Sequence, residues 1–150
     1  MKKYTNYIII GAVVILLIIG AVATSGKGTR KEPKMKEITY TEWTEIRKST
    51  TPVVVVIGQT GCGYCEQYKP VITAVANEYN ITINYIDLTK FSQEENYNLN
   101  ESITYLREEE WGTPTTLLIQ DGDNLEDVIG GYVEKTELVA YLKANNIIES

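Results

Sequence analysis

The sequence predicts an α/β fold in which helices flank a central mixed β-sheet. One observation is the continuous β-branched run at residues 53–57, which is typical of a strand buried on both faces of a sheet. Another is the helical spacing that follows, where one face gathers the apolar residues Tyr68, Val71, Ile72, Val75, Ala76 and Tyr79. Further strand and helix patterns then alternate along the chain, which gives the order β-α-β-α-β-β-α for one globular domain.

The segment in front of the first central strand predicts a helix, with a short strand ahead of it. Thr41 can cap a helix in which Trp43 and Ile46 share one face, and this helix ends before Pro52. Beyond the long helix, residues 81–88 predict a second central strand.

The region between the second and third strands predicts a polar connection followed by one helix. Residues 92–100 are polar and lead into a helical segment that contains Ile103 and Leu106. The acidic run 108–110 ends this helix just ahead of Trp111. A solvated helix face explains that acidic run.

The last part of the chain predicts a hairpin and a closing helix. Residues 115–119 form the third strand, the DGDN turn at 121–124 reverses the chain, and residues 125–132 pair back as a fourth strand. Two glycines then precede an amphipathic helix whose apolar residues are Leu138, Val139 and Leu142.

The N-terminus carries an uncharged apolar segment, residues 8–23, after Lys2 and Lys3. It is slightly shorter than a usual membrane span, and the Ala-Val-Ala at 21–23 resembles a signal-peptidase site. Residues 1–24 therefore predict a hydrophobic helix that serves as a membrane anchor, or alternatively a signal peptide that is cleaved from a secreted protein. The five basic residues at 27–36 outnumber the two lysines before the segment, which taken alone favours keeping the domain inside. We nevertheless expect the domain on the extracytoplasmic side, because a short basic start, an apolar core and a small-residue end direct export.

Charge divides the rest of the chain into a linker and a domain. Residues 1–36 contain seven Lys or Arg and one acid, whereas residues 37–150 contain seven basic and nineteen acidic residues. The basic, polar segment 25–36 predicts a linker beside the membrane, and residues 37–150 form the globular domain. The acidity of this domain argues against nucleic acid as a partner.

Cys62 and Cys65 are the only cysteines, and they lie where the first buried strand passes into the long helix. The unpaired N–H groups and the positive dipole end of a helix N-terminus favour an anion, and a thiolate is such an anion. Thiol–disulfide exchange requires a thiolate nucleophile, and Cys65 lies one helical turn further on, where it can attack a mixed disulfide.

Other roles for the two cysteines fit less well. A structural disulfide that closes so small a loop restrains little of the unfolded chain. A metal site needs further ligands, and the chain contains no histidine and no third cysteine. Cysteine hydrolases need a base, and again no histidine is present.

The chain resembles the thioredoxin superfamily over residues 37–150. The resemblance rests on a buried strand before the CGYC motif, on Pro70 five residues after the second cysteine, and on the segment GTPTTLLI at 112–119. In that family a proline at the place of Pro114, preceded here by Thr113, takes the cis form and faces the cysteines. Among its members, the chain looks like the membrane-anchored bacterial thioredoxin-like proteins, including those of the bacteriocin-transport accessory type.

The resemblance implies a thiol–disulfide oxidoreductase that acts on exported or cell-surface proteins. Cys62 attacks and Cys65 resolves, with no cofactor beyond their redox-active disulfide, and a redox partner recycles the pair. The residues expected to contact the protein or peptide substrate are Thr113, Pro114, Gly63, Tyr64 and Trp111. Helix-end packing is an equal alternative for Trp111.

The chain also departs from the thioredoxins proper. They carry a buried aspartate six positions before the first cysteine, where this chain has Val56, and a nearby lysine that the segment 83–88 lacks. A buried valine neither accepts a proton nor perturbs Cys65 electrostatically, which leaves the reducing or oxidising direction open. Two rival functions remain: a non-catalytic accessory module for peptide export, and a dimeric metal carrier built from paired CGYC sites.

Overall fold

The computed structural model describes residues 34–149, which form a mixed β-sheet flanked by helices. Three strands make up its centre: β2 (Val53–Gly58), β3 (Ile83–Asp87) and β4 (Thr115–Gln120). The short strands are β1 (Met35–Glu37), β5 (Asp123–Asn124) and β6 (Ile129–Gly130). The sheet order is β1-β3-β2-β4-β5, and β6 also pairs with β4. β1, β2 and β3 are parallel, whereas β4 runs antiparallel to β2. The α/β class predicted from the sequence is confirmed.

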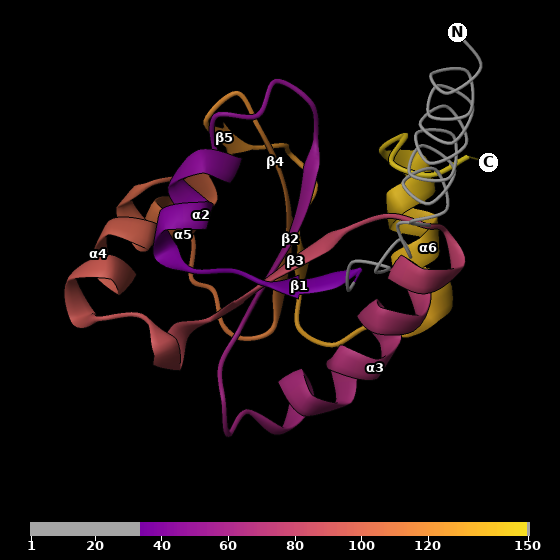
Figure 1. The fold of residues 1–150 in the computed structure, drawn as a ribbon, viewed down its shortest axis with the longest axis horizontal. Coiled ribbons are helices and arrows are strands. Elements are labelled where there is room, and N and C mark those ends of the chain that lie inside the picture. Colours follow the sequence, from indigo (N-terminus) through magenta and orange to yellow (C-terminus); the bar gives the residue numbers. More distant parts are fainter. Residues whose placement is uncertain (1–33, 150) are drawn as a thin grey trace, which may run out of the picture. The chain divides into compact units, whose positions relative to one another are not determined.

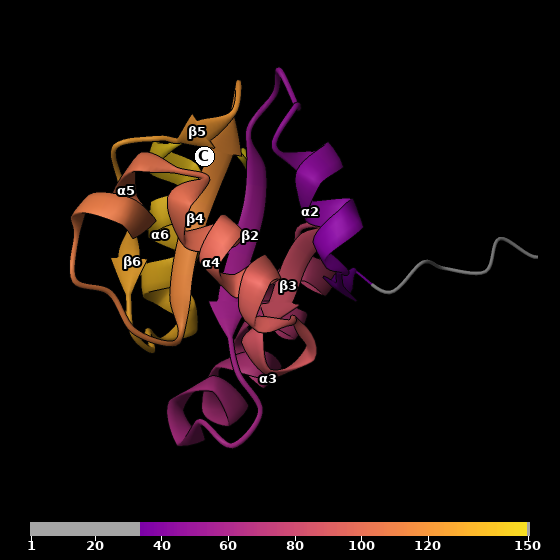
Figure 2. The same ribbon diagram turned by 90° about the vertical axis from the view of Figure 1, so that its left-hand side faces the viewer.

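Helices cover both faces of this sheet. Figure 1 shows α3 (Gly63–Glu78) and α6 (Lys135–Ala144) on one side, with α2 (Tyr40–Ile46), α4 (Gln93–Glu101) and α5 (Thr104–Glu108) on the other. Figure 2 turns the second side toward the viewer. Alternate residues of β2 point to opposite faces, so its β-branched run is buried against both helical layers.

Each layer has its own hydrophobic core. Beneath α3 and α6, Val54 and Val56 pack with Tyr68, Ile72 and other residues of the two helices. On the opposite face, the buried cluster comprises Ile38, Trp43, Val55, Ile57, Ile86, Phe91, Leu99, Ile103, Leu106, Leu117 and Ile119. The predicted apolar face of α3 is confirmed, with Tyr68, Ile72, Val75 and Ala76 fully buried.

A short strand and a helix precede the central strands, as expected. β1 (Met35–Glu37) pairs with β3 and begins two residues before position 37, where we placed the start of the domain. The predicted cap of α2 is wrong. Thr39, not Thr41, is the N-cap, because its side chain accepts a hydrogen bond from the Glu42 backbone N–H, and the Glu42 carboxylate accepts one from the Thr39 N–H at 2.8 Å.

The region between β3 and β4 differs from the prediction of a polar connection and one helix. After a 3₁₀ turn, η1 (Leu88–Lys90), the polar stretch is itself a helix, α4, and Ser92 with Glu95 forms its capping box. Ile103 adopts an extended conformation and separates α4 from α5. Most of α4 faces solvent and only Leu99 is buried, so the usual apolar stripe is missing from its sequence.

The return strand after β4 is shorter than predicted. Only β6 (Ile129–Gly130) falls within the predicted strand 125–132, while β5 (Asp123–Asn124) lies in the segment predicted as the turn 121–124; both pair with β4. The predicted closing helix is confirmed as α6, with Leu138 and Leu142 buried. The predicted apolar segment at 8–23 and most of the basic linker lie outside the described residues. Within 34–149, no helix is long and apolar enough to cross a membrane.

Candidate redox site

The two cysteines lie at the junction between β2 and α3. β2 ends at Gly58, and the loop 59–61 includes Gly61, whose φ of +86° is a conformation that favours glycine. Cys62 then takes the N-cap position of α3, and its Sγ accepts a hydrogen bond from the Cys65 backbone N–H at 3.2 Å. A sulfur atom thus occupies the place that a capping oxygen usually fills.

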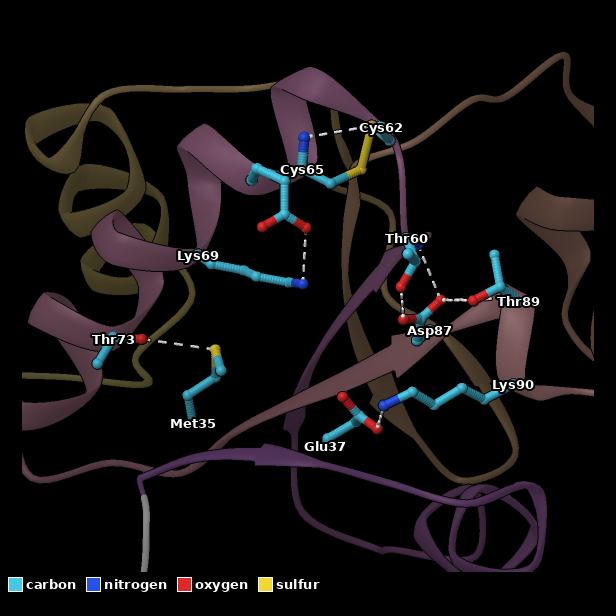
Figure 3. A network of polar contacts seen from close by, with 11 residues as sticks. Met35, Glu37, Thr60, Cys62, Cys65, Lys69, Thr73, Asp87, Thr89 and Lys90 are labelled. Carbon is cyan, nitrogen blue, oxygen red and sulfur yellow. Dashed lines mark hydrogen bonds and ion pairs between the residues drawn. A yellow bond between two sulfur atoms is a disulfide. The ribbon is translucent and has the colours of Figure 1, made fainter.

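Cys62 and Cys65 form a disulfide (Figure 3). Their Cα atoms are 5.2 Å apart, a separation that the first turn of a helix provides. Cys62 is half-buried, whereas Cys65 is 0% exposed. The first sulfur is therefore the one that an external disulfide can approach, and the second lies behind it.

The loop before β4 lies beside the disulfide, as the resemblance implies. Cys62 Sγ lies 3.5 Å from the carbonyl oxygen of Thr113, and the Thr113–Pro114 peptide bond is cis. Pro114 is buried, and its own carbonyl accepts a hydrogen bond from the Gly131 N–H at 2.7 Å. The structure therefore brings Thr113 and Pro114, distant in sequence, to the cysteine pair.

Of the other three predicted contact residues, two lie beside the disulfide and the third packs against α4 and α5. Gly63 and Tyr64 belong to the first turn of α3 beside the disulfide, and the Tyr64 side chain is 65% exposed. The Trp111 indole N–H instead donates to Asn100 Oδ1 at 3.0 Å and to the Leu106 carbonyl at 3.1 Å. The structure thus gives Trp111 a packing role at the end of α5, and its contact with substrate remains a prediction.

A buried carboxylate, which was not predicted from the sequence, holds the loop that leads to Cys62. Asp87, at the end of β3, is 2% exposed and accepts hydrogen bonds from the N–H and hydroxyl of Thr60, at 3.0 and 2.6 Å. The N–H and hydroxyl of Thr89 donate to the same carboxylate at 3.1 and 2.7 Å (Figure 3). Burial by itself would raise the pKa of Asp87, but these hydrogen bonds outweigh it and lower the pKa to about 2.

Tyr85 and Lys69 form a second polar feature at this end of the sheet. Tyr85 is 1% exposed, and its ring lies 5.1 Å from the Lys69 ammonium, which also pairs with Glu66 at 2.9 Å. Burial raises the pKa of Tyr85 to about 12, and the nearby carboxylates of Asp87 and Glu66 act in the same direction. The phenol therefore keeps its proton at neutral pH.

Val56 lies at the position that the resemblance marks as a departure. It is 0% exposed and is paired with Tyr85 on β3 and with Thr116 on β4. Among residues 34–149, no group of three or more His, Cys, Asp or Glu side chains is arranged to hold a metal ion. The chemistry visible at the site is that of the two sulfur atoms.

Comparison with known proteins identifies relatives over most of the chain. A family model described as a thioredoxin-like domain matches residues 40–146. A thioredoxin of Acidithiobacillus ferridurans is 31% identical over 99 residues, covering 66% of this chain and 83% of the relative. A thioredoxin of Allochromatium vinosum is 33% identical over 101 residues, covering 67% and 86%. The crystal structure of a Malassezia sympodialis thioredoxin shares the fold, with a TM-score of 0.56 and 18% identity over 73% of this chain and 89% of that one.

Proposed function

The chain belongs to the thioredoxin-like domain family, and from this premise we propose that it exchanges thiols and disulfides with exported or cell-surface proteins of a bacterium. The observation that carries the proposal is the Cys62–Cys65 disulfide at the N-terminus of α3. One sulfur is accessible and the other is buried one turn behind it, which suits a nucleophile and a resolving thiol.

In the reducing direction, the Cys62 thiolate attacks one sulfur of a substrate disulfide. A mixed disulfide forms, and the other substrate sulfur leaves with the electron pair and takes a proton from water. Cys65 then attacks Cys62, the bond to the substrate breaks, and the enzyme disulfide forms as the second substrate thiol is released. The dithiol loses two electrons and the substrate gains two, so no bound cofactor is needed.

Substrate binding is proposed at the Thr113–Pro114 loop. Within residues 34–149, neither the N–H nor the carbonyl of Thr113 has a backbone hydrogen-bond partner. Such unpaired groups can pair with an extended peptide segment, and the Thr113 carbonyl already lies beside Cys62. The exposed Tyr64 ring and Gly63 on the adjoining turn would border the same segment.

The segment before the domain supports a location at the cell membrane. We propose that residues 8–23 anchor the protein in the cell membrane as a single pass, with the basic stretch 25–36 as the linker and the redox domain outside, as the export-type N-terminus favours. A redox partner in the same compartment returns the cysteines to their starting state. The bacteriocin-transport accessory type fits this arrangement of anchor and domain.

A redox titration of the full-length chain in mild detergent tests the proposed function. The protein is equilibrated in graded thiol–disulfide buffers, free thiols are alkylated, and the products are counted by mass. A reversible two-electron step is the expected result, and its midpoint states whether reduction or oxidation of partners is favoured. Cysteines that never interconvert across the series would overturn the proposal.

A further inference from the structure

The Tyr85 hydroxyl is a buried polar atom without a hydrogen-bond partner among residues 34–149. Buried hydroxyls in folded proteins are normally hydrogen-bonded, and leaving one unpaired is destabilising. The comparable hydroxyl of Tyr68, on the same side of the sheet, pairs with the Thr116 hydroxyl at 3.1 Å. The Tyr85 hydroxyl is therefore free to take a hydrogen-bond partner when the redox state of the site changes.

The ring of Tyr85 points toward the active-site end of the sheet. Its backbone is paired with Val56, but its ring reaches Gly58, two residues further along β2. A Cβ atom placed on Gly58 would lie 2.7 Å from Cζ of Tyr85 and would also collide with the hydroxyl oxygen. The hydroxyl therefore lies at the point from which the chain departs toward Cys62.

Cys65 is the sulfur that α3 turns toward this side of the sheet. It is fully buried and lies three residues before Tyr68, which packs in the same cluster as Tyr85. Residues three apart share one face of a helix. In the oxidised protein its Sγ is an uncharged disulfide sulfur, and reduction turns it into a thiol or thiolate, to which a phenol donates a stronger hydrogen bond.

Lys69 brings a positive charge to the same place. It lies one helical turn beyond Cys65, and Figure 3 shows its side chain extending from α3 toward Asp87. Its ammonium lies over the Tyr85 ring and is held by Glu66. A cation at this position favours a negative charge on a neighbouring sulfur, whereas the carboxylates of Glu66, Asp87 and Glu37, which also act on Tyr85, oppose it.

We propose that the Tyr85 hydroxyl becomes the hydrogen-bond partner of Cys65 when the disulfide is reduced. The phenol donates to the Cys65 thiolate, and the Lys69 ammonium adds its positive charge. Both groups act as positioning residues, because they prepare the resolving thiol rather than react. The inference rests on the proposed function and deepens it by naming the groups that prepare the second step.

The step balances without any further reactant. The Cys65 thiol gives its proton to water, and the thiolate is stabilised by the hydrogen bond and by the nearby cation. It attacks the Cys62 sulfur of the mixed disulfide, the Cys62–Cys65 bond forms, and the Cys62–substrate bond breaks. The substrate sulfur leaves with the electron pair and takes a proton from water.

The test measures the pH at which Cys65 ionises. In the full-length C62S chain Cys65 is the only thiol, and its thiolate is followed by ultraviolet absorbance against a C62S/C65S reference. Adding Tyr85→Phe should shift the ionisation upward by about one pH unit or more, because a hydrogen bond to a charged group is lost. Adding Lys69→Met should shift it upward as well, without removing the phenol.

Tyr141→Phe is the matched control, because it removes a part-buried phenol whose hydroxyl donates to the Asp127 carbonyl. It should leave the ionisation of Cys65 unchanged. A second readout uses chains with both cysteines: Tyr85→Phe should destabilise the reduced protein but not the oxidised one, in which the hydroxyl has no partner. A purely structural role would change both forms equally.

The two proposals fail in different ways. If the wild-type cysteines do not cycle in the redox titration, the proposed function is wrong. If they cycle, but Cys65 ionises at the same pH in the Tyr85→Phe chain as in its parent, the inference about Tyr85 alone is overturned.

Discussion

The two ends of the β2–β3 pair are built from different kinds of side chains. At the first end Val54 is paired with Ile83, and both are buried and apolar. At the second end Gly58 is paired with Asp87, so one strand has no side chain and the other carries a buried carboxylate. The same two strands thus change from hydrophobic core to polar site over five residue pairs.

The two ends therefore contribute differently: the apolar end to the stability of the fold, and the polar end to the positioning of the redox site. The apolar end contributes free energy through burial, which depends little on pH or on the redox state. The polar end fixes the loop that carries Cys62, through Asp87 and Thr60, and its contribution depends on charge. Substitutions at the two ends should therefore be distinguishable by what they change.

The largest effect is expected at the polar end, at the cysteines. Cys62→Ser should abolish exchange because it removes the attacking sulfur, while Cys65→Ser should accumulate mixed disulfides because it removes the resolving one. Disulfide exchange on a model substrate and mass analysis of trapped adducts measure both. Exchange that persists in the Cys62→Ser chain would contradict the assigned roles.

Leu118→Ala tests the apolar end, since Leu118 is paired with Val54 and is fully buried. It should lower the free energy of unfolding by about 2 to 5 kcal/mol, through lost burial and a residual cavity. The midpoint potential of the cysteines should not move. Urea denaturation measures the loss, and the half-buried Leu125→Ala is the control with a smaller effect. A shifted potential would show that the two ends are not separable.

Asp87→Asn should cost about 2 kcal/mol of stability at neutral pH, and the cost should depend on pH. The folded-state pKa is lowered from 3.8 to about 2, so the ionised carboxylate stabilises the fold above its ordinary pKa. That contribution is lost as the pH falls from about 4 to about 2. Urea denaturation across this range should show the wild type approaching the variant. A loss that is independent of pH would refute the role of the charge.

The smallest effect lies away from both ends, at the start of α2. Thr39→Ala should reduce stability by about 1 kcal/mol, because it removes the side-chain half of the capping box. Thr41→Ala, two residues on, should cost less, since Thr41 is exposed and does not cap the helix. Thermal unfolding of the two variants compares them directly. An equal loss in both would argue against Thr39 as the cap.

The central elements were predictable because each is long and marked by its apolar pattern. The β-branched run of β2 and the periodic face of α3 depend only on local sequence. α4 was missed because Leu99 is its single buried residue, although Ser92 and Glu95 have capping-box spacing. The cap of α2 was misassigned although Thr39 and Glu42 have that same spacing.

The residues of the candidate site were likewise only partly predictable from the sequence. Cys62, Cys65 and the Thr113–Pro114 loop were predictable from motif and order. Their juxtaposition appears in the contact between Cys62 Sγ and the Thr113 carbonyl.

Two contacts at the polar end were not predictable from the sequence. The hydrogen bonds of Asp87 with Thr60 and the approach of the Tyr85 ring to Gly58 both depend on the register of β2 against β3. An acid at a strand end, followed two residues later by Thr89, was the one local signal for the carboxylate.

The collision that forbids a side chain at Gly58 also links this position to Tyr85 in evolution. A side chain added at the first position requires the Tyr85 ring to move or to be replaced by a shorter side chain, because one space holds both. The two positions lie on different strands and far apart along the chain, yet the size of the side chain at position 85 limits what position 58 can carry. Their covariation would preserve a filled floor beneath the cysteine loop while exchanging the chemical group that lies there.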